Sequence, residues 1–540
     1  MSCVTGRLQR VASIALLTRP SRPAFATARL YSKEAASINN ESTIEATPST
    51  TAIKRTGLRG LPTSVLFRSL AVLSVASLPQ PALSLLLRAV KRHSHWVDSI
   101  PLLRGIARRT FYNHFCIGET KSEIERHVDE LRRMGVRGVI LSFAREAADS
   151  SKSSASAQLT AEDTELQSWV HSNLETIDKL HQGDYLGVRC TGAGRATLRC
   201  MDDVFERSKA FGLGEALRRG SAEVNVFKDA LTKICAAAKS RGIRVLIDAE
   251  DTRRQLTIDH VALSIMPIFN KGDHAVVLNT YQMYLKAGVS KLVAHLHHSI
   301  ENNYVLGVKM VRGAYIHSEP DRDLLHDTKA DTDAEYDQAV RLLVGSNGAS
   351  LADENGAGAT WSADLMLATH NTHSAREALR LYRERFLTRG IGPAAHGAGL
   401  RSLAFAQLKG MADELSFKLT EEIESMSAEA SGTALEAEPD VARRLPGIGV
   451  YKYSIWGTFQ ECLLYMLRRA EENKDAAARS RTTALAILRV YLLLASKKIV
   501  NLTVFVMDLV PPPIASVILG ADMALIGDTE YCSAPVTRAS

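Results

Sequence analysis

The sequence is poor in cysteine, with seven in 540 residues and no two in a C-x-x-C arrangement. It therefore lacks a cysteine-rich zinc site and argues against a disulfide framework. Basic residues form no stripe interleaved with aromatic ones, and the net charge of +7 is modest for this length, so nucleic-acid binding is not indicated. A hydrophobic content of 46% is enough for a sizeable core. The length allows one large catalytic domain with extensions, or about two to three smaller domains.

Several site motifs are also missing. No G-x-G-x-x-G, P-loop or H-E-x-x-H pattern occurs, so a Rossmann dinucleotide site is not supported. Three histidines in the segment HLHH (His295, His297 and His298) lie in an expected helix without a neighbouring cysteine or carboxylate cluster. We interpret them as a surface helix face, and no metal site is predicted.

A transmembrane helix requires an uninterrupted run of about 20 apolar residues. The N-terminal apolar stretch 65–90 contains no such run. We expect helices that pack on the catalytic domain or lie on a membrane, with insertion into the bilayer as the alternative. A second apolar stretch lies in the C-terminal extension 476–540, for which the sequence indicates no role. The residues that interrupt the first stretch are Arg68, Pro79, Pro81 and Arg88.

The N-terminal 33 residues are basic and contain no aspartate or glutamate, which is typical of a mitochondrial presequence. The segment Arg29-Leu30-Tyr31-Ser32 resembles a matrix-processing site. Residues 34–58 are rich in Ser, Thr, Ala and Glu and are interpreted as a disordered linker. A helical N-terminal region is expected over 59–135 and the catalytic domain over 136–475.

Short apolar runs alternate with helical segments from about residue 185 onwards. Eight such runs predict an α/β fold, a (βα)₈ barrel with an N-terminal helical extension, with a doubly wound sheet as the alternative. A helix and a strand (122–134 and 136–143) precede them, a Ser/Ala-rich surface insertion is expected at 150–160, and 419–445 resembles another insertion. The eight expected strands are 185–190, 243–247, 275–278, 305–311, 365–369, 403–406, 415–418 and 449–453. The expected helices are 224–241, 284–302, 332–344, 373–389 and 459–473.

Polar side chains follow almost every one of these runs. In a barrel the carboxyl ends of all strands meet at one mouth, which is where barrel active sites lie. Loops favour Gly, Ser and Asp, so repeated Arg, Gln, His and Tyr at strand ends indicate function rather than simple loop polarity. The residues concerned are Arg189, Thr191, Asp248, Glu250, Asn279, Gln282, Lys309, Arg312, Tyr315, His370, Asn371, Gln407 and Tyr453.

The last expected helix carries a basic face. Thr458 and Glu461 form a capping-box pattern, so the helix should begin at about Phe459. Two adjacent arginines share this face with a tyrosine and a glutamate, at spacings that place them together. They could clamp a carboxylate, because the planar arginine fork binds it at two points, or they could form a solvated ion-paired helix end. The face consists of Tyr465, Arg468, Arg469 and Glu472.

A second basic group is expected at the mouth and could hold a phosphate-bearing cofactor through side chains. Its members are Lys309, Arg312, Lys329, His370 and Asn371. Together with the arginine clamp, these residues predict a barrel enzyme with an anionic cofactor and an amino or imino acid substrate.

Eight motifs in this order resemble the proline dehydrogenase family, the mitochondrial FAD enzymes of eukaryotes, over roughly residues 100–475. Any single motif is weak, but eight in register are specific. The motifs are IDAEDT (247–252), NTYQMYLK (279–286), GVKMVRGAY (307–315), HDTKADTD (326–333), ATHN (368–371), QLKGMAD (407–413), VYKY (450–453) and YMLRRAEEN (465–473).

The resemblance implies a distorted (βα)₈ barrel with non-covalent FAD at the strand ends, and the helix 459–473 folded over the mouth. It implies that a cationic residue on or directly after the 305–311 strand, Lys309 or Arg312, reaches the flavin. The implied cofactor-binding residues are Val277, Asn279, Gln282, Lys309, Val311, Arg312, Gly313, Ala314, Lys329, His370, Asn371, Gln407, Leu408, Arg469 and Glu472.

The resemblance further implies that L-proline is oxidised to Δ1-pyrroline-5-carboxylate, with electrons passed to ubiquinone at the inner mitochondrial membrane. Arg468 and Arg469 would hold the proline carboxylate, and the tyrosines would pack the ring. The implied catalytic residues are Arg189, Asp248, Tyr315 and Tyr453, with Tyr453, Tyr465, Arg468 and Arg469 binding substrate.

The chain departs from the family at the first strand, where Arg189 replaces the common lysine, so the expected pair of Arg189 with Asp248 differs in geometry. Three other functions stay open at this point. The substrate could be 4-hydroxyproline. The protein could be a barrel lyase or aldolase with Lys309 as a Schiff-base lysine. It could also be a membrane-associated scaffold, which would leave the strand-end residues unexplained.

Overall fold

The computed structural model describes residues 62–76, 78–144, 155–316, 318–345, 351–352, 358–385, 399–431 and 447–472. Several sequence predictions lie outside these residues. They are the presequence 1–33, the linker 34–58 and the C-terminal extension 476–540, together with parts of the two expected insertions.

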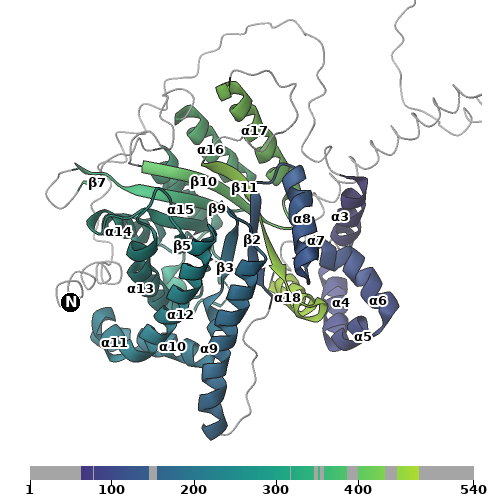
Figure 1. Ribbon diagram of the computed structural model, residues 1–540, viewed down its shortest axis with the longest axis horizontal. Coiled ribbons are helices and arrows are strands. Elements are labelled where there is room, and N and C mark those ends of the chain that lie inside the picture. Colours follow the sequence, from purple (N-terminus) through teal and green to yellow (C-terminus); the bar gives the residue numbers. More distant parts are fainter. Residues whose placement is uncertain are drawn as a thin grey trace, which may run out of the picture.

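Among the described residues, eight parallel strands form a closed barrel in which the last strand pairs back with the first (Figure 1). Chain order and spatial order coincide around the barrel, so the predicted (βα)₈ fold is confirmed. The strands are β2 (Gly138–Phe143), β3 (Tyr185–Val188), β4 (Arg244–Ile247), β5 (Val277–Gln282), β6 (Leu306–Val311), β9 (Ser362–Ala368), β10 (Gly399–Leu408) and β11 (Ile448–Trp456).

Helices surround the barrel and cover its outer surface (Figure 1). They are α8 (Lys121–Arg133), α9 (Ala155–Asp178), α10 (Arg195–Phe211), α11 (Leu213–Arg219), α12 (Ser221–Ser240), α13 (Thr252–Phe269), α14 (Gly288–Glu301), α15 (Lys329–Val340), α16 (Thr372–Arg383) and α17 (Asp413–Ser431). Helix α18 (Phe459–Glu472) lies apart from this layer and packs against the N-terminal helices. Short elements are η2 (Cys190–Ala193), η3 (Arg322–Leu324), η4 (Arg341–Gly345) and the hairpin β7 (Leu351–Ala352) and β8 (Gly358–Ala359).

The strands alternate between two apolar layers, as the two-residue period of a strand requires. On β4, Val245 and Ile247 belong to the large core between strands and helices, whereas Leu246 belongs to a smaller core inside the barrel. The inner core also contains Ile140, Leu278, Met366 and Ala404 from other strands. This alternation decides which strand residues can face the barrel mouth.

The expected strand 415–418 is wrong, because these residues lie in helix α17. The short run alternates like a strand, but the buried residues Leu415, Leu419, Ile423 and Met426 recur at the helical spacing of three and four. The strand that completes the barrel is β2, close to the expected strand 136–143. The interpretation of 419–445 as an insertion is wrong for 419–431, which belongs to α17. Residues 155–160 of the expected insertion 150–160 begin α9, and its placement on the surface stays a prediction.

The amino-terminal end of the barrel contains a buried ionic network. The Arg244 guanidinium forms an ion pair with Asp364, whose carboxylate also accepts hydrogen bonds from the Ser402 hydroxyl (2.5 Å) and the Ala275 N–H (2.6 Å). Arg244 also donates to the Tyr185 hydroxyl (2.8 Å) and the Ala275 carbonyl (2.7 Å). The network therefore connects strands from opposite parts of the sheet at the end away from the mouth.

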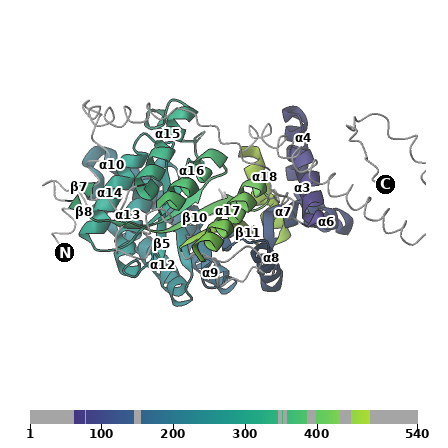
Figure 2. The same cartoon turned by 90° about the horizontal axis from the view of Figure 1, so that it is seen from above.

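An N-terminal group of helices packs at one side of the barrel, next to α18, in both views (Figures 1 and 2). Leu83 and Leu87 of α4 join Phe459 and Leu463 of α18 in one buried apolar cluster. Within the described part of the chain, none of the helices combines the length and apolar character that a membrane crossing requires. The group comprises α3 (Thr63–Ala76), α4 (Gln80–Arg92), α5 (Ser94–Ser99), α6 (Pro101–Ala107), η1 (Arg108–Tyr112), α7 (Asn113–Phe115) and the short strand β1 (Cys116–Gly118).

The interpretation of the HLHH histidines as a surface face is wrong for His295 and His298, which are buried between α14 and its neighbours. His295 Nδ1 lies 2.9 Å from the Tyr281 hydroxyl, and His298 Nδ1 lies 2.8 Å from the Tyr304 hydroxyl. Burial lowers the pKa of each histidine to about 4. The described residues contain no group of side chains that could hold a metal ion.

Stability is therefore expected to fall as the pH is lowered from about 6.5 to about 4. In this pH range the histidines bind protons in the unfolded state and not in the folded state, so protonation stabilises the unfolded state. The urea midpoint, measured in steps from pH 7.5 to 4.5, should show this slope. The slope should become smaller in a His298→Gln variant and not in the exposed control His373→Gln. An equal slope in the wild type and His298→Gln would contradict the prediction.

Candidate active site

Three side chains from separate strands meet inside the carboxyl end of the barrel. Asp248 follows β4, Lys309 lies on β6 and Tyr453 lies on β11. Lys309 Nζ is 2.5 Å from Asp248 Oδ1, and the Tyr453 hydroxyl donates to Asp248 Oδ2 at 2.8 Å. The Lys309 ammonium also lies 5.5 Å from the centre of the Tyr453 ring. The Asp248 carboxylate therefore binds a cation and a phenol at the same time.

Tyr453 is held as a hydrogen-bond donor. Burial, followed by the nearby Asp248 carboxylate, raises the pKa of Tyr453 well above its usual value. A Cβ added at Gly187 of β3 would lie 3.0 Å from the Tyr453 hydroxyl, so the small residue on the neighbouring part of the barrel leaves room for the ring. The phenol stays protonated, and its proton points at Asp248.

A second polar group surrounds Glu250, two residues beyond Asp248. The Tyr315 hydroxyl donates to Glu250 Oε2 at 2.6 Å, and the Thr191 N–H donates to Oε1 at 3.4 Å. Burial of this carboxyl group raises the pKa of Glu250, although the Tyr315 hydrogen bond opposes the shift. Sequence analysis placed Glu250 among the strand-end residues at the mouth but gave it no catalytic or binding role. Its position in the motif IDAEDT, two residues after Asp248, was the available signal.

Gln282 contributes an acceptor at the end of β5. Its Nε2 donates to the Glu250 carbonyl at 2.8 Å, which fixes the orientation of the amide. Gln282 Oε1 is buried and has no hydrogen-bond partner among the described residues. A buried acceptor of this kind is costly unless a donor from a bound molecule satisfies it.

Arg189 lies at the carboxyl end of β3, against helix α18. Its guanidinium carbon is 4.8 Å from the centre of the Tyr465 ring. The ion-pair partner seen for Asp248 is Lys309. The expected pair of Arg189 with Asp248 stays a prediction.

The capping box at the start of α18 is present as predicted. The Glu461 carboxylate accepts from the Thr458 N–H at 3.0 Å, and the Glu461 N–H donates to the Thr458 hydroxyl at 3.3 Å. Tyr465 is thereby placed at the mouth beside Tyr453, in the same apolar cluster. The side chains of Arg468, Arg469 and Glu472 lie outside the described atoms.

A group rich in polar contacts lies where β6 ends beside the first turns of α15 and α16. Arg312 donates to Asp333 (2.6 Å), to the Thr369 hydroxyl (3.0 Å) and to the Ser374 hydroxyl (2.9 Å). Lys329, at the first position of α15, pairs with the same Asp333. Asp333 compensates only one of the two positive charges, so one net cation and two helix N-termini remain in one place, and these favour a bound anion.

The remaining residues of this edge also lie at or near a helix start. The Asn371 side chain accepts from the Ser374 N–H at 3.2 Å and caps α16. His370 Nε2 accepts from the Leu408 N–H at 3.2 Å, and the exposed Leu408 ends β10. Val311 is the half-buried last residue of β6, and Gly313 and Ala314 lie in the partly exposed turn that follows. Gly313 has a φ of +141°, and a Cβ there would lie 1.6 Å from the Tyr284 ring, so only glycine fits.

Three predicted cofactor residues point away from the mouth. Val277 packs in the core between strands and helices. Asn279 donates to Asp259 of α13 at 2.8 Å. Gln407 accepts from the Ser416 hydroxyl of α17 at 2.9 Å and donates to the Thr369 carbonyl at 3.2 Å. The predicted strand 275–278 ended before Asn279, whereas β5 continues to Gln282, so Asn279 and Gln282 face opposite sides of the strand.

A closed (βα)₈ barrel with charged and phenolic side chains gathered at the carboxyl ends of its strands has the organisation of a barrel enzyme. The family model described as proline dehydrogenase matches residues 124–482, which is more than half of the chain. The chain therefore belongs to the proline dehydrogenase family. The resemblance read from the eight sequence motifs is confirmed.

The chain is also similar to individual proteins over most of its length. Proline dehydrogenase 1, mitochondrial, of Arabidopsis thaliana is 27% identical over 459 residues, which cover 77% of this chain and 81% of the plant protein. Hydroxyproline dehydrogenase of Bos taurus is 24% identical over 401 residues, or 70% of this chain and 79% of the bovine protein. A crystal structure of proline utilization A (PutA) from Bdellovibrio bacteriovorus, inactivated by N-propargylglycine, aligns with 15% identity and a TM-score of 0.49. It covers 76% of this chain and 37% of the bacterial one.

Proposed function

We propose that this protein oxidises L-proline to Δ1-pyrroline-5-carboxylate with bound FAD and passes the electrons to ubiquinone. The observation that carries the proposal is the meeting of Lys309, Asp248 and Tyr453 at the mouth of a barrel from the proline dehydrogenase family. Cofactor, product and electron acceptor follow from the family resemblance and are part of the proposal.

The residues at the mouth fit a flavin. The free acceptor Gln282 Oε1 would receive a donor such as a ring N–H. Arg312 and Lys329, beside the first turns of α15 and α16, would hold the phosphates, with His370 and Asn371 at the same edge. FAD, once bound, would supply the hydride acceptor for the substrate.

The substrate would be fixed by its carboxylate and its ring. Arg468 and Arg469, on the last two turns of α18, would bind the carboxylate at two points. Tyr453, Tyr465 and Tyr315 would enclose the pyrrolidine ring. Fixing the ring in one orientation removes much of the entropic cost of reaching the reactive geometry.

The charged groups of the chain would then act on the bound ring. The Lys309 ammonium would stabilise negative charge that develops near it, because a preformed charge in a partly dehydrated site needs no reorganisation. The Tyr315 hydroxyl directs its proton to Glu250, so its oxygen is left as an acceptor for the substrate amine. Asp248 would hold Lys309 and Tyr453 in place.

The proposed location is the mitochondrial matrix, at the surface of the inner membrane. The composition of residues 1–33 and the mitochondrial names of the relatives support this location. Contact with the membrane would bring the enzyme to ubiquinone.

One alternative substrate has a specific observation in its favour. The match to bovine hydroxyproline dehydrogenase covers 70% of this chain, so 4-hydroxyproline has to be compared with proline. The lyase or aldolase alternative is disfavoured, because Lys309 is ion-paired with Asp248 and a Schiff-base lysine needs an uncharged amine.

The test is an absorbance spectrum of the purified protein without residues 1–31, before and after anaerobic addition of proline. We expect a flavin band that bleaches with proline and more slowly with 4-hydroxyproline. An Arg468→Met variant should retain the band and bleach slower by orders of magnitude, because the carboxylate anchor is lost. A colourless, folded protein that cannot be reconstituted with FAD would refute the proposal. A flavin band that proline does not bleach would rule out proline as the substrate.

A further inference from the structure

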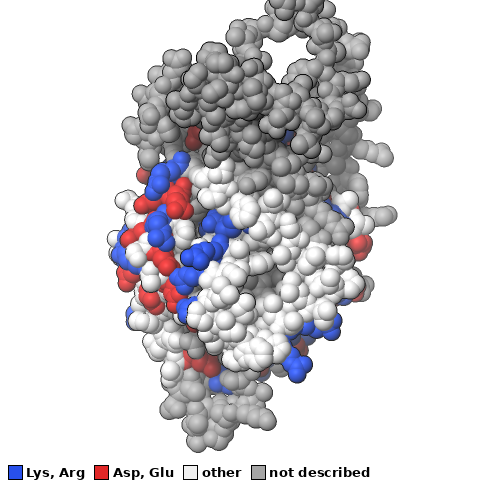
Figure 3. Space-filling view, turned by 90° about the vertical axis from the view of Figure 1, so that its right-hand side faces the viewer, with Lys and Arg blue, Asp and Glu red and all other residues white. Residues whose placement is uncertain are grey.

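Helices α4–α6 present an apolar face that is not covered by the described part of the chain. No side chain of α5 or α6 is buried. Figure 3 shows this side of the molecule as a broad uncharged area, bordered on one side by intermixed basic and acidic residues and at the lower right by a few basic ones. The large apolar side chains on it include Leu85 (65% exposed), Trp96 (53%), Leu102 (72%) and Ile106 (55%).

The composition of this face is typical of a membrane interface. Tryptophan is enriched where an apolar region meets water, and Trp96 is in ring contact with His93 and His95. On α4, Leu85 shares a helix face with Arg88 and Arg92 at spacings of three and seven residues. Long basic side chains can lie along an apolar layer and keep their charged ends in the headgroup region.

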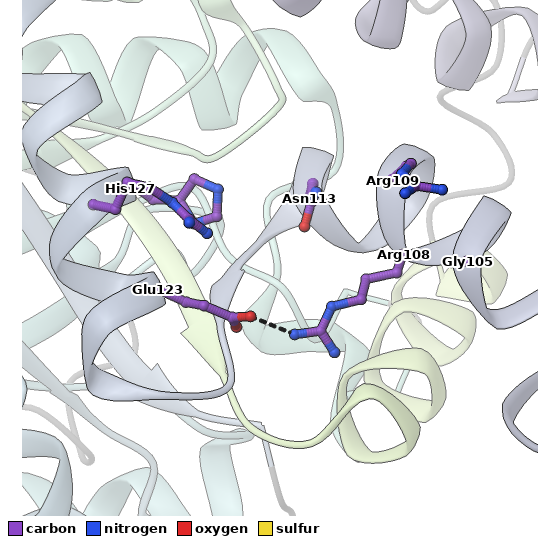
Figure 4. A pocket seen from close by; sticks show the side chains of 7 residues that line it. Gly105, Arg108, Arg109, Asn113, Glu123 and His127 are labelled. Atoms are coloured by element: carbon purple, nitrogen blue, oxygen red, sulfur yellow. Dashed lines mark hydrogen bonds and ion pairs between the residues drawn. The ribbon is translucent and has the colours of Figure 1, made fainter. Parts of the chain in front are cut away.

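A cationic cavity of about 300 Å³ adjoins this face (Figure 4). Its walls come from α6, η1 and α7 on one side and from α8 on the other, so α6 is shared by the apolar face and the cavity. The lining includes three arginines (Arg108, Arg109 and Arg126), His127 and one carboxylate, Glu123.

Two arginines of the cavity remain available for an anion. Arg108 donates to Glu119 at 3.1 Å and to Glu123 at 2.7 Å, so its charge is already compensated. Arg109 and Arg126 have no ion-pair partner among the described residues. His127 is engaged through Nδ1 with the Ile117 carbonyl at 2.5 Å. An anion in the cavity would therefore meet two uncompensated guanidinium groups, which bind phosphate well.

We propose that the α4–α6 face lies on an anionic phospholipid bilayer and that Arg109 and Arg126 bind a headgroup phosphate in the adjoining cavity. The apolar side chains supply non-specific attachment, and the cavity supplies the preference for anionic lipid. This deepens the inner-membrane location proposed above and rests on it. Lipid binding is measured without proline, so failure of one proposal is distinguishable from failure of the other.

The position of Trp96 allows a direct test on the full-length protein. The sequence has four tryptophans, and the other three, Trp169, Trp361 and Trp456, are at most 6% exposed. Phosphatidylcholine vesicles with and without phosphatidylglycerol, carrying brominated acyl chains, are added while tryptophan emission is recorded. We expect quenching with the anionic vesicles, and loss of the quenched component in a Trp96→Phe variant.

Sedimentation with the same vesicles distinguishes the contribution of the apolar face from that of the cationic cavity. Arg109→Gln/Arg126→Gln should lower the partition onto anionic vesicles by about 10–30-fold and leave that onto neutral ones unchanged. The matched control Arg207→Gln/Arg218→Gln removes two exposed arginines elsewhere and should have a much smaller effect. Leu102→Ser/Ile106→Ser should lower binding to both vesicles at least tenfold, against the control Phe211→Ser/Ile268→Ser.

Three results would overturn the proposal. One is equal binding of the wild type to both vesicles, or no binding. Another is an unchanged lipid preference in the double arginine variant. The third is a smaller oligomer for Leu102→Ser/Ile106→Ser in sedimentation velocity without lipid, which would assign the face to a second copy of the chain. All substituted side chains are exposed or line an open cavity, so the variants are expected to fold, and circular dichroism checks this.

Discussion

Replacing Lys309 with methionine is expected to slow proline-dependent bleaching of the flavin by about 10²–10³-fold. Methionine keeps most of the apolar stem, so the main loss is the positive charge between Asp248 and Tyr453. The rate should be measured anaerobically by stopped flow at saturating proline, which separates it from electron transfer to quinone. Lys309→Arg retains the charge and should recover part of the rate.

The same substitution also removes the partner of a carboxylate that is only 17% exposed. Loss of one member of a buried pair costs about 3–5 kcal/mol, which is an upper value for this partly exposed site. Lys309→Met/Asp248→Asn should therefore recover stability in urea without recovering the rate. A double variant that recovers both would show that Lys309 acts only through folding.

A matched control is available outside the mouth. Lys291 on α14 pairs with Asp259 of α13 at 2.8 Å, in the layer between helices and strands. Lys291→Met also breaks a partly buried Lys–Asp pair, and it should lower stability while the bleaching rate changes less than twofold or so. If Lys291→Met slowed the rate as much as Lys309→Met, the proposed role of the Lys309 charge would be refuted.

The residues at the mouth could be predicted in part because apolar runs locate the strands, and the polar residues at the ends of the strands then lie at the mouth. The sequence identified Lys309, Asp248 and Tyr453 as strand-end residues, and the structure brings them together. It could not identify which of them pair. Lys309 lies on β6 and Asp248 directly follows β4, and β5 separates these strands, so the contact depends on barrel closure and on the register of three strands.

Differences between the sequence analysis and the structure have equally local causes. Asn279 and Gln282 were both expected at the cofactor, but a strand that continues to Gln282 turns Asn279 toward Asp259. Gln407 is turned outward toward Ser416 in the same way. The HLHH segment is polar by composition, but His295 and His298 are buried with hydrogen bonds to Tyr281 and Tyr304, which lie outside the segment. A short stretch of sequence shows the periodicity of a helix or strand, but it does not show which residues elsewhere in the chain its side chains contact.

A substitution in the buried network at the amino-terminal end of the barrel should lower stability without slowing the reaction, unlike the loss of the Lys309 charge. Asp364→Ala is expected to lower the free energy of unfolding by about 3–5 kcal/mol and to leave the bleaching rate of the folded protein unchanged. The substitution leaves the Arg244 guanidinium without its carboxylate, and it removes the acceptor for the Ala275 N–H and the Ser402 hydroxyl. Urea denaturation gives the first quantity, and stopped-flow bleaching at low temperature gives the second.

Asp364→Asn provides the intermediate case. The amide retains the size of the side chain and an acceptor for one of the donors, but not the charge, so the loss should be smaller than for alanine. The two ends of the barrel then differ in a measurable way, since the Lys309→Met/Asp248→Asn variant is stable but slow and Asp364→Ala is unstable but fast. A slow rate in folded Asp364→Ala would mean that the network at the amino-terminal end also sets the geometry of the mouth, and the separation of stability from catalysis along the strands would be wrong.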